Sequence, residues 1–152
     1  MEQQNIFVRR ATVADLDLIA PLFDAYRQFY NQACDLALAR EFLRERLEQD
    51  QSVIFLALGP DGSAVGFTQL YPSFSSASAK RIFILNDLFV NPAARRSGVG
   101  RALLQAAADF GRTAGAARLT LSTAHTNTSA QSLYEANGWL RDEIFRCYNL
   151  TL

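Results

Sequence analysis

The sequence has few of the residues that bind metals or form disulfides. It contains one histidine and two cysteines, Cys34 and Cys147, among 152 residues. The cysteines lie far apart and show no metal-ligand spacing, so the sequence predicts neither a metal site nor a disulfide framework. Cysteines used in this way are typical of a reduced, intracellular protein.

Long apolar runs and an excess of one charge are missing as well. No apolar run approaches the roughly 20 residues that span a bilayer, and the first ten residues, MEQQNIFVRR, lack the apolar core of a signal peptide. Lys+Arg and Asp+Glu number 15 each, so no overall field favours nucleic acid. The sequence therefore predicts a cytoplasmic protein with neither a membrane nor a nucleic acid as partner.

The composition that remains is that of an ordinary globular domain. Hydrophobic residues make up 49% and charged residues 20% of the chain, and the length suits one domain with a sizeable core. Alternating or continuous apolar runs predict strands at 5–10, 52–58, 64–74, 81–90, 117–123, 138–140 and 144–152. Helical spacing predicts helices at 16–30, 36–50, 99–113 and 127–137. This order predicts one mixed α/β domain.

Three details refine that pattern. Thr12 and Asp15 have the spacing of a capping box before the first helix. Pro21 lies inside the same helix and predicts a kink or a split. The segment 81–90 is the most apolar strand, so we expect it to be central and buried on both faces.

A glycine-containing loop follows that central strand. Its sequence is Arg95-Arg96-Ser97-Gly98-Val99-Gly100, and a helix begins directly after it. A dinucleotide fingerprint would need a third glycine where Leu103 stands, and the Gly-Lys-Ser/Thr of an ATPase phosphate loop is missing. Backbone N–H groups at a helix N-terminus, with arginines beside them, can still bind an anion such as a pyrophosphate. The alternative is a strand-to-helix turn without a ligand.

The C-terminal half, from about Ile82 onward, resembles the GCN5-related N-acetyltransferase (GNAT) family. The loop 95–100 matches the family signature Arg/Gln-x-x-Gly-x-Gly/Ala, and LNDLFVNP resembles the family's central strand and its exit. TNTSAQSLYEANGW resembles a second family motif, and the last strands are similar to an Hpa2-like subgroup. The order and spacing of these motifs are far more specific than Gly-x-Gly alone.

The resemblance implies a fold, a cosubstrate and a set of binding residues. The fold is a mixed sheet, splayed between its fourth and fifth strands and flanked by about four helices, in a single N-acetyltransferase domain over residues 1–152. The cosubstrate is acetyl-CoA, with no metal. The residues implied to bind it are Leu88, Phe89 and Val90 along the strand, Arg95, Arg96, Ser97, Gly98, Val99, Gly100 and Arg101 in the loop and helix start, and Asn127 and Tyr134 in the last helix.

The resemblance also implies catalytic roles. Tyr134 is the general acid, and a bulge in the central strand aims a backbone N–H, that of Leu88, at the thioester carbonyl as an oxyanion donor. Tyr134 and Asn127 lie seven positions apart, so both can face one groove. The alternatives are that Tyr134 is a core residue and that Asn127 caps its helix, a role compatible with cofactor binding.

The general base is left open by the sequence. Many relatives carry a glutamate where this chain has Asn86, and an asparagine cannot act as a base. Asp87 is adjacent, but strand alternation places it on the opposite face unless a bulge turns it. Asp87 could then contact the substrate, or it could be a structural carboxylate while ordered waters take the proton.

The predicted activity is acetyl transfer to a primary amine, with a small amine or polyamine slightly favoured over a protein lysine or N-terminus. The acceptor is expected between the first two helices and the segment LYPSFSS, lined by Tyr30, Tyr71 and Phe74. Two other functions remain open: a non-catalytic acyl-CoA-binding module, and an anion-binding domain for another nucleotide. The apolar C-terminal strand has no charged tail to protect its edge, and together with the family resemblance it predicts a homodimer.

Overall fold

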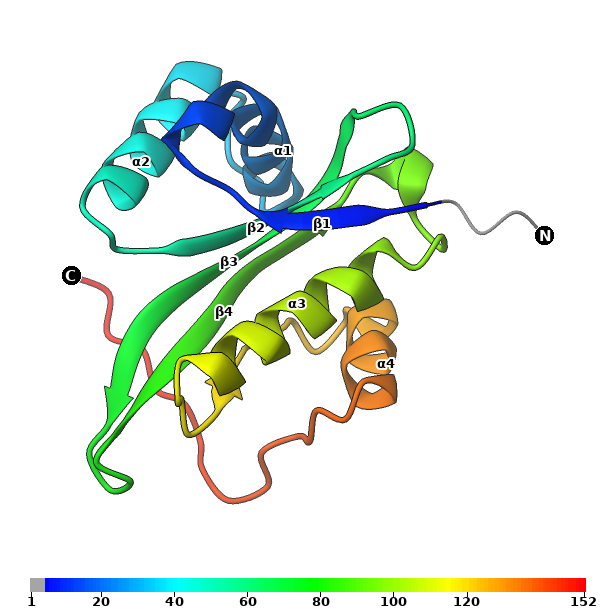
Figure 1. Ribbon diagram of the computed structural model, residues 1–152. Helices are drawn as coiled ribbons and strands as arrows, with labels where there is room; N and C mark the ends of the chain where they lie inside the picture. Colours follow the sequence, from blue (N-terminus) through cyan, green and yellow to red (C-terminus); the bar gives the residue numbers. More distant parts are fainter. Residues whose placement is uncertain (1–4) are drawn as a thin grey trace. The chain divides into compact units, whose positions relative to one another are not determined.

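The computed structural model describes residues 5–152. It comprises two compact units, divided between Ser122 and Thr123, and each is described here by itself. The first unit contains a five-stranded sheet in the order β1-β2-β3-β4-β5 (Figure 1). Its strands are β1 (Phe7–Arg10), β2 (Val53–Leu58), β3 (Ala64–Ser75), β4 (Lys80–Val90) and β5 (Leu119–Thr120). The first four pair antiparallel, and β5 pairs with β4 in parallel, so the predicted mixed sheet is confirmed.

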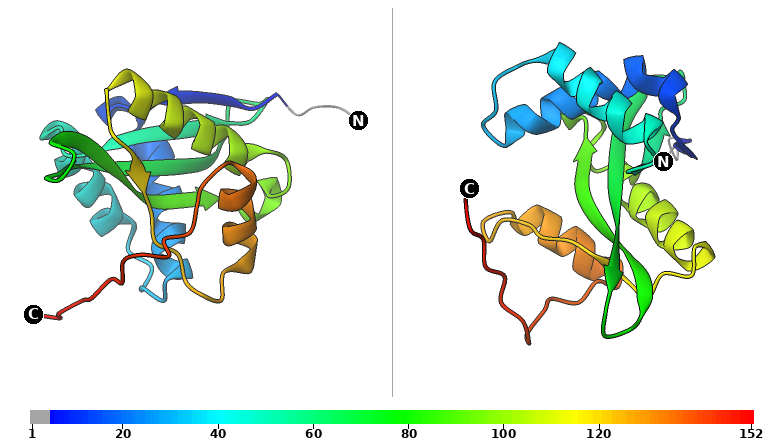
Figure 2. Two further views of the ribbon diagram at one scale, coloured as in Figure 1. Left: turned by 90° about the horizontal axis from the view of Figure 1, so that it is seen from below. Right: turned by 90° about the vertical axis from the view of Figure 1, so that its left-hand side faces the viewer.

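Helices cover both faces of this sheet. α1 (Leu16–Phe29) and α2 (Leu36–Glu48) lie on one face, and α3 (Val99–Thr113) lies on the other (Figures 1 and 2). The buried core on the α1–α2 face includes Ile19, Leu43 and Phe67, all fully shielded from solvent. Val99 and Leu103 of α3 form the second cluster, with Leu88 and Val90 of β4 packed against it. Phe89, between Leu88 and Val90, packs in the first cluster instead. Successive side chains of β4 therefore pack on opposite faces, as a central strand requires.

The entry into α1 is fixed by a charged capping arrangement. A short 3₁₀ turn, η1 (Val13–Asp15), precedes the helix, and the predicted capping box of Thr12 and Asp15 is present. The Asp15 carboxylate also accepts two hydrogen bonds from Arg9 of β1, at 2.7 and 2.8 Å. These hydrogen bonds lower the pKa of Asp15. α1 runs without interruption through Pro21, so the helix is not split there.

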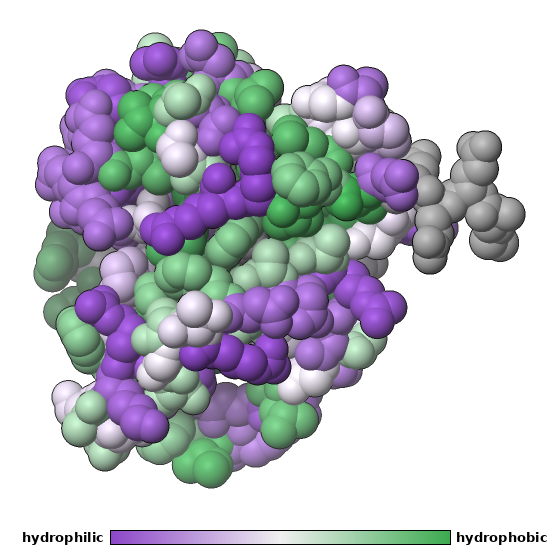
Figure 3. All heavy atoms as spheres, viewed as in Figure 1, coloured by the Kyte–Doolittle hydropathy of each residue, from purple (hydrophilic) through white to green (hydrophobic). Residues whose placement is uncertain are grey.

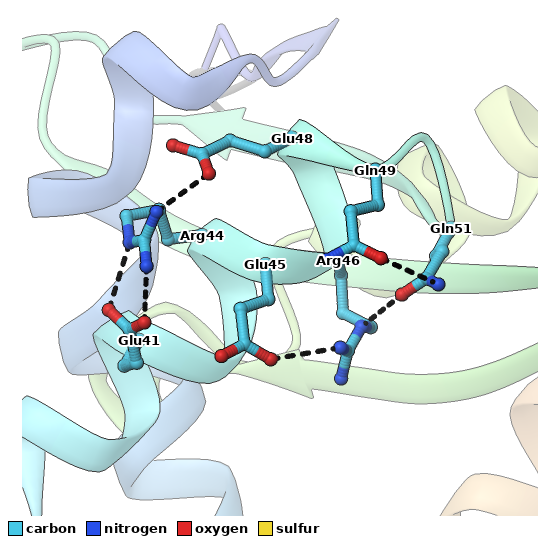
Figure 4. Close-up of polar contacts among 7 residues, drawn as sticks. All are labelled: Glu41, Arg44, Glu45, Arg46, Glu48, Gln49 and Gln51. Atoms are coloured by element: carbon cyan, nitrogen blue, oxygen red, sulfur yellow. Dashed lines mark hydrogen bonds and ion pairs between the residues drawn. The ribbon is translucent and has the colours of Figure 1, made fainter.

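Ion pairs cover the outer side of α2. Arg44 contacts the carboxylates of Glu41 and Glu48, and Arg46 contacts Glu45 and Gln51 (Figure 4). Hydrophilic residues dominate the surface where α2 lies, at the upper left of Figure 3. Ala39 and Leu43, on the opposite side, are completely buried. The helix is thus amphipathic, and its apolar side faces α1 and the buried core.

Two irregularities shape β4. Gln69 of β3 pairs with Asp87, whereas the next residue, Leu70, pairs with Leu85, so Asn86 is the extra residue of a β-bulge. On its other side β4 pairs with β5 only through Phe83 and Ile84. Within residues 5–122, no strand pairs with β4 on that side beyond Ile84. The predicted bulge and the predicted splay between the fourth and fifth strands are both confirmed.

The second unit contains one helix, α4 (Thr128–Ala136). Gly138 has a φ of 88° and ends the helix in the left-handed conformation. The strands predicted at 138–140 and 144–152 are wrong, because no residue between 137 and 152 is in a strand. The Asp142 carboxylate instead accepts the N–H groups of Ile144 and Phe145, which commits these donors to a local turn. The prediction of a homodimer was based in part on the C-terminal strand. That support is lost, and the homodimer stays a prediction.

None of the helices within residues 5–152 has the length and apolar content needed to cross a membrane. The cytoplasmic location stays a prediction.

Replacing Asp15 tests the contribution of the capping arrangement. We expect Asp15→Asn to lower the free energy of unfolding by about 1–2 kcal/mol at pH 7, because charge-assisted hydrogen bonds from Arg9 are lost. Since the folded state lowers the pKa of Asp15, this stabilisation is present above about pH 4, the carboxyl's ordinary pKa, and disappears as the pH falls through the folded value. Urea unfolding at several pH values measures the difference.

Asp17→Asn is the matched control for this substitution. Asp17 pairs with Arg40 at 3.1 Å, but its side chain is 88% exposed. We expect a loss below about 0.5 kcal/mol. Equal losses in the two variants would contradict the structural role assigned to Asp15.

Candidate active site

A pocket of about 400 Å³ lies between α1, α2 and the sheet within the first unit. We call it the α1–α2 pocket. Its walls come from α1, the loop after it, α2, β3 and β4, and five of the eleven lining residues are aromatic. The lining residues are Phe23, Tyr26, Arg27, Tyr30, Gln32, Leu38, Ala39, Phe42, Tyr71, Asn86 and Asp87. The volume is at the lower end of the range of small-molecule sites.

The bulge in β4 determines which side chains reach this pocket. In a regular strand, Asn86 and Asp87 would point to opposite faces. Here the Asn86 side chain donates a hydrogen bond to the Asp87 carboxylate at 2.9 Å, and both residues line the pocket. The bulge thus turns Asp87 toward the α1–α2 face. The sequence alone left open whether a bulge would do so.

The Asp87 carboxylate is almost entirely buried, with a residue exposure of 2%. Burial raises its pKa, and hydrogen bonds from the Gln69 and Asn86 side chains offset only part of that increase. Gln69, which faces Asp87 across the β3–β4 pair, donates through its amide nitrogen, while its amide oxygen has no partner among the described residues. A carboxyl group in this environment can take up a proton more readily than an exposed one.

Two tyrosines flank this carboxylate. The Tyr26 hydroxyl donates to the backbone carbonyl of Asn86 at 3.1 Å, at the bulge itself. Burial and the negative charge of Asp87 raise the pKa of both Tyr26 and Tyr71. Both rings therefore stay protonated at neutral pH.

The glycine loop lies beyond the end of β4 in the same unit. It continues from a short 3₁₀ turn, η2 (Pro92–Ala94), and Gly98, with a φ of 86°, is the N-cap of α3. No side chain caps this N-terminus, so the first N–H groups of α3 lack helical acceptors and can bind an anion. Arg95, Arg96 and Arg101 are exposed around it. Arg95 is held by its hydrogen bond to the Val90 carbonyl at 3.0 Å.

The second unit holds the remaining predicted residues. The Asn127 side chain accepts the N–H of Ala130 at 3.3 Å and so caps α4, as the alternative interpretation expected. Tyr134 lies two turns along the same helix, with its ring 6.1 Å from that of Trp139.

Comparison with known proteins identifies the family. A sequence model of the acetyltransferase (GNAT) family matches residues 19–139. The chain is 53% identical over 145 residues to the "Uncharacterized N-acetyltransferase YhfO" of Bacillus subtilis (strain 168), covering 95% of this chain and 97% of that protein. The chain belongs to the GNAT family. It is therefore an acetyl-CoA-dependent N-acetyltransferase, and the resemblance read from its motifs is confirmed.

Other relatives extend this result. A solved structure described as a probable acetyltransferase is 44% identical, with a TM-score of 0.92 and coverage of 96% of this chain and 97% of that one. The aminoglycoside N(6')-acetyltransferase type 1 of Klebsiella aerogenes is 32% identical over 114 residues, 74% of each chain. The Hpa2-like subgroup stays a prediction.

Three of the four residues predicted to contact the acceptor amine line the pocket, and one does not. Tyr30, Tyr71 and Asp87 line the α1–α2 pocket. Phe74 does not, because it lies near the end of β3, 69% exposed, with the Arg81 guanidinium 4.2 Å from its ring centre. Its place in LYPSFSS suggested a lining role, but that segment extends along the β3–β4 hairpin beyond the pocket.

Sequence reasoning missed several pocket residues. Phe23, Tyr26 and Arg27 lie with the predicted Tyr30 on one side of α1, a helical spacing that predicts a helix but not a pocket wall. Phe42 of α2 completes the aromatic wall, 5.6 Å from Phe23 between ring centres. The density of aromatic residues in 23–30 was the available signal.

The burial of Asp87 predicts that its ionisation lowers the free energy of unfolding in a pH-dependent way. Because the folded state raises the pKa of Asp87, its ionisation destabilises the protein fully above the folded pKa and not at all below the unfolded value of about 3.9. We therefore expect Asp87→Asn to raise the melting temperature at pH 7. The Asn amide can also donate to the unpartnered oxygen of Gln69.

Calorimetric melting at pH 7 and near pH 5 measures this effect. The advantage of the Asn variant should shrink as the pH falls toward the raised pKa of Asp87. A variant that melts below the wild type at pH 7 would show that the carboxylate's hydrogen bonds outweigh its desolvation.

Proposed function

We propose that the protein transfers the acetyl group of acetyl-CoA to a small primary amine bound in the α1–α2 pocket. The observation that carries this proposal is the buried carboxylate of Asp87 in a pocket with aromatic walls. An ammonium group suits such a site, because a carboxylate pairs with its charge and aromatic faces attract it. Two curated relatives are named for small-molecule amines: the aminoglycoside acetyltransferase above, and the streptothricin acetyltransferase of Streptomyces lavendulae, which is 35% identical over 92 residues.

Acetyl-CoA would lie along β4 and the glycine loop. Its pyrophosphate would meet the uncapped N-terminus of α3, with Ser97, Gly98 and Val99 contributing backbone groups and Arg95, Arg96 and Arg101 contributing charge. Its pantetheine arm would pair with the backbone of Leu88, Phe89 and Val90, on the side of β4 that β5 leaves open. Asn127 would contribute its side-chain amide while it caps α4.

Asp87 would bind the incoming ammonium and accept its proton. Its raised pKa makes it a better base than an exposed aspartate, and Asn86 beside it cannot take this role. The neutral amine then attacks the thioester carbon, and the carbonyl oxygen of the tetrahedral intermediate accepts a hydrogen bond from the Leu88 N–H. Collapse breaks the C–S bond, Tyr134 protonates the departing thiolate, and the extra proton on the new amide nitrogen returns through solvent to the Tyr134 phenolate. The products are the N-acetylated amine and CoA.

A panel of amines tests the proposed reaction directly. Free thiol released from acetyl-CoA is measured for each amine against a reaction without amine. Thiol release that depends on an amine, with a matching acetylated product by mass spectrometry, supports the proposal. A protein that binds acetyl-CoA but releases no thiol with any amine would be a binding module instead.

The loop assignment predicts a loss of CoA affinity in Gly100→Val. Gly100 is the second residue of α3, where a branched side chain would occupy the space of the pyrophosphate. We expect the Kd for CoA to rise at least tenfold, about 1.4 kcal/mol, with the fold retained by circular dichroism. Gly100→Ala is the matched control, because the family signature accepts alanine there, and its Kd should change only a few-fold.

Gly98→Val is a weaker test of the same loop. The φ of 86° at Gly98 strains any residue with a Cβ, although open space surrounds the position. A lower CoA affinity in Gly98→Val could come from backbone strain as well as from steric blocking of the pyrophosphate, so this variant does not separate the two causes. Unchanged CoA affinity in both Val variants would show that the pyrophosphate binds elsewhere.

Tyr134→Phe tests the general acid. The substitution removes the hydroxyl and keeps the ring, so a packing role predicts near-normal turnover. An acid role predicts a loss in kcat of about 10²–10⁴-fold with little change in acetyl-CoA affinity. A tyrosine hydroxyl, with an ordinary pKa near 10, can protonate a thiolate without being ionised at neutral pH.

The measurement needs a check on the rate-limiting step. A pre-steady-state burst in the wild type would show that product release limits kcat, and single-turnover rates are then compared. Turnover within a few-fold of the wild type, with chemistry limiting, would remove Tyr134 as the acid.

A further inference from the structure

Arg27 is a charged residue of the α1–α2 pocket that the proposed reaction does not use. It lies on α1, directly after Tyr26, and its side chain is half-buried. Its Nη1 atom is shielded from solvent and has no hydrogen-bond partner in the described part of the chain. A buried N–H group without an acceptor is costly, and a charged one more so. The Arg27 Nη1 group can therefore donate a hydrogen bond to an oxygen atom of a ligand, because the described chain supplies no acceptor.

Asp24, three residues earlier on α1, does not fill this role. Its carboxylate accepts hydrogen bonds from the Asp35 N–H at 2.9 Å and from the side chains of Cys34 and Gln28, each at 3.2 Å. These contacts hold the loop between α1 and α2. The pKa of Asp24 is lowered first by the Asp35 N–H, and the charge of Arg27 contributes least. No ion pair joins Arg27 to a carboxylate anywhere in residues 5–152.

The pocket therefore presents one positive and one negative group. Asp87 comes from β4, on the sheet side, and Arg27 comes from α1; the other lining residues are neutral. Tyr26, next to Arg27 in sequence, contacts the bulge beside Asp87 through its hydroxyl. A ligand with an amine for Asp87 and an anionic group for Arg27 satisfies both charges. A polyamine satisfies one and places a further ammonium in a pocket that contains a guanidinium.

We propose that the acceptor is an amine that also carries a carboxylate, the chemistry of a free amino acid, and that Arg27 binds this carboxylate. The inference rests on the proposed function, and it replaces the polyamine preference drawn from sequence with an amino-acid class. The guanidinium can form two parallel hydrogen bonds to a carboxylate, which fixes the ligand's orientation. The amine is then directed to Asp87, and the apolar part of the ligand lies against the aromatic walls.

Matched pairs of amines that differ only in the carboxylate test this inference. The pairs are L-phenylalanine with 2-phenylethylamine and L-leucine with isoamylamine, and spermidine serves as the polycation. For wild-type enzyme we expect kcat/KM for the better amino acid to exceed that of its partner at least tenfold, and that of spermidine by more. A tenfold ratio corresponds to about 1.4 kcal/mol, which one charge-assisted hydrogen bond can supply.

Arg27→Met removes the charge and keeps much of the apolar stem. For the better pair, we expect the ratio of kcat/KM for the amino acid to kcat/KM for the amine without a carboxylate to fall to about one. Arg40→Met is the matched control, because Arg40 of α2 pairs with exposed Asp17 outside the pocket, and it should keep the wild-type preference. Equal or better acetylation of the decarboxylated amines or spermidine by the wild type would overturn the inference, as would a preference that survives in Arg27→Met.

A binding measurement separates this inference from the proposed reaction. Calorimetric titration of the same amino acids into wild type and Arg27→Met, with CoA present, requires no turnover. Binding that Arg27→Met weakens at least tenfold supports the carboxylate site even if no acetylation occurs, and then only the proposed reaction fails. Acetylation of the amines without a contribution from Arg27 means that the reaction stands and the amino-acid class is wrong.

Discussion

The extra residue in β4 is the constraint on which the pocket depends. Without the bulge at Asn86, strand alternation would place Asn86 and Asp87 on opposite faces of the sheet. With it, the two side chains lie together and the Asp87 carboxylate faces the aromatic rings of α1. Tyr26 fixes the same point from the helix side, because its hydroxyl donates to the Asn86 carbonyl. The bulge thus connects the sheet to the chemistry that the pocket can support.

The buried carboxylate is maintained against a cost to stability. Its hydrogen bonds to Gln69 and Asn86 do not fully offset desolvation, which is why its pKa is raised. Burial of the apolar core around Ile19, Leu43 and Phe67 supplies free energy of the opposite sign. Groups retained at such a cost are concentrated at functional sites. Asp87 lies within β4, and a hydrogen bond from Gln69 of β3 holds its carboxylate.

The sequence predicted the helices well, because the signals are local, whereas the β4 bulge was implied by the family resemblance. Capping by Thr12 and Asp15, the glycine at 98 and the helical spacing in 99–113 each act within a few residues. The closing strands were wrong because an apolar run says nothing about pairing, whereas Asp142 provides a local alternative. The composition of the pocket was predicted only in part. Its members come from separated elements, and the α1 pattern that contributes Phe23, Tyr26 and Arg27 has the same period as a core-facing stripe.

β4 also explains how one strand can serve two ligands of different charge. Leu88 and Val90 pack toward α3, so their backbone lies beside the arginine-rich loop, where an anionic cosubstrate is favoured. Asp87 points to the other face, where an ammonium is favoured. In the proposed reaction, selection between the two ligands would arise from this local separation and not from a global field, because the chain as a whole has no net charge. The position of Asn86 in β4 therefore fixes both the base and the place where the amine meets the thioester in the proposed reaction.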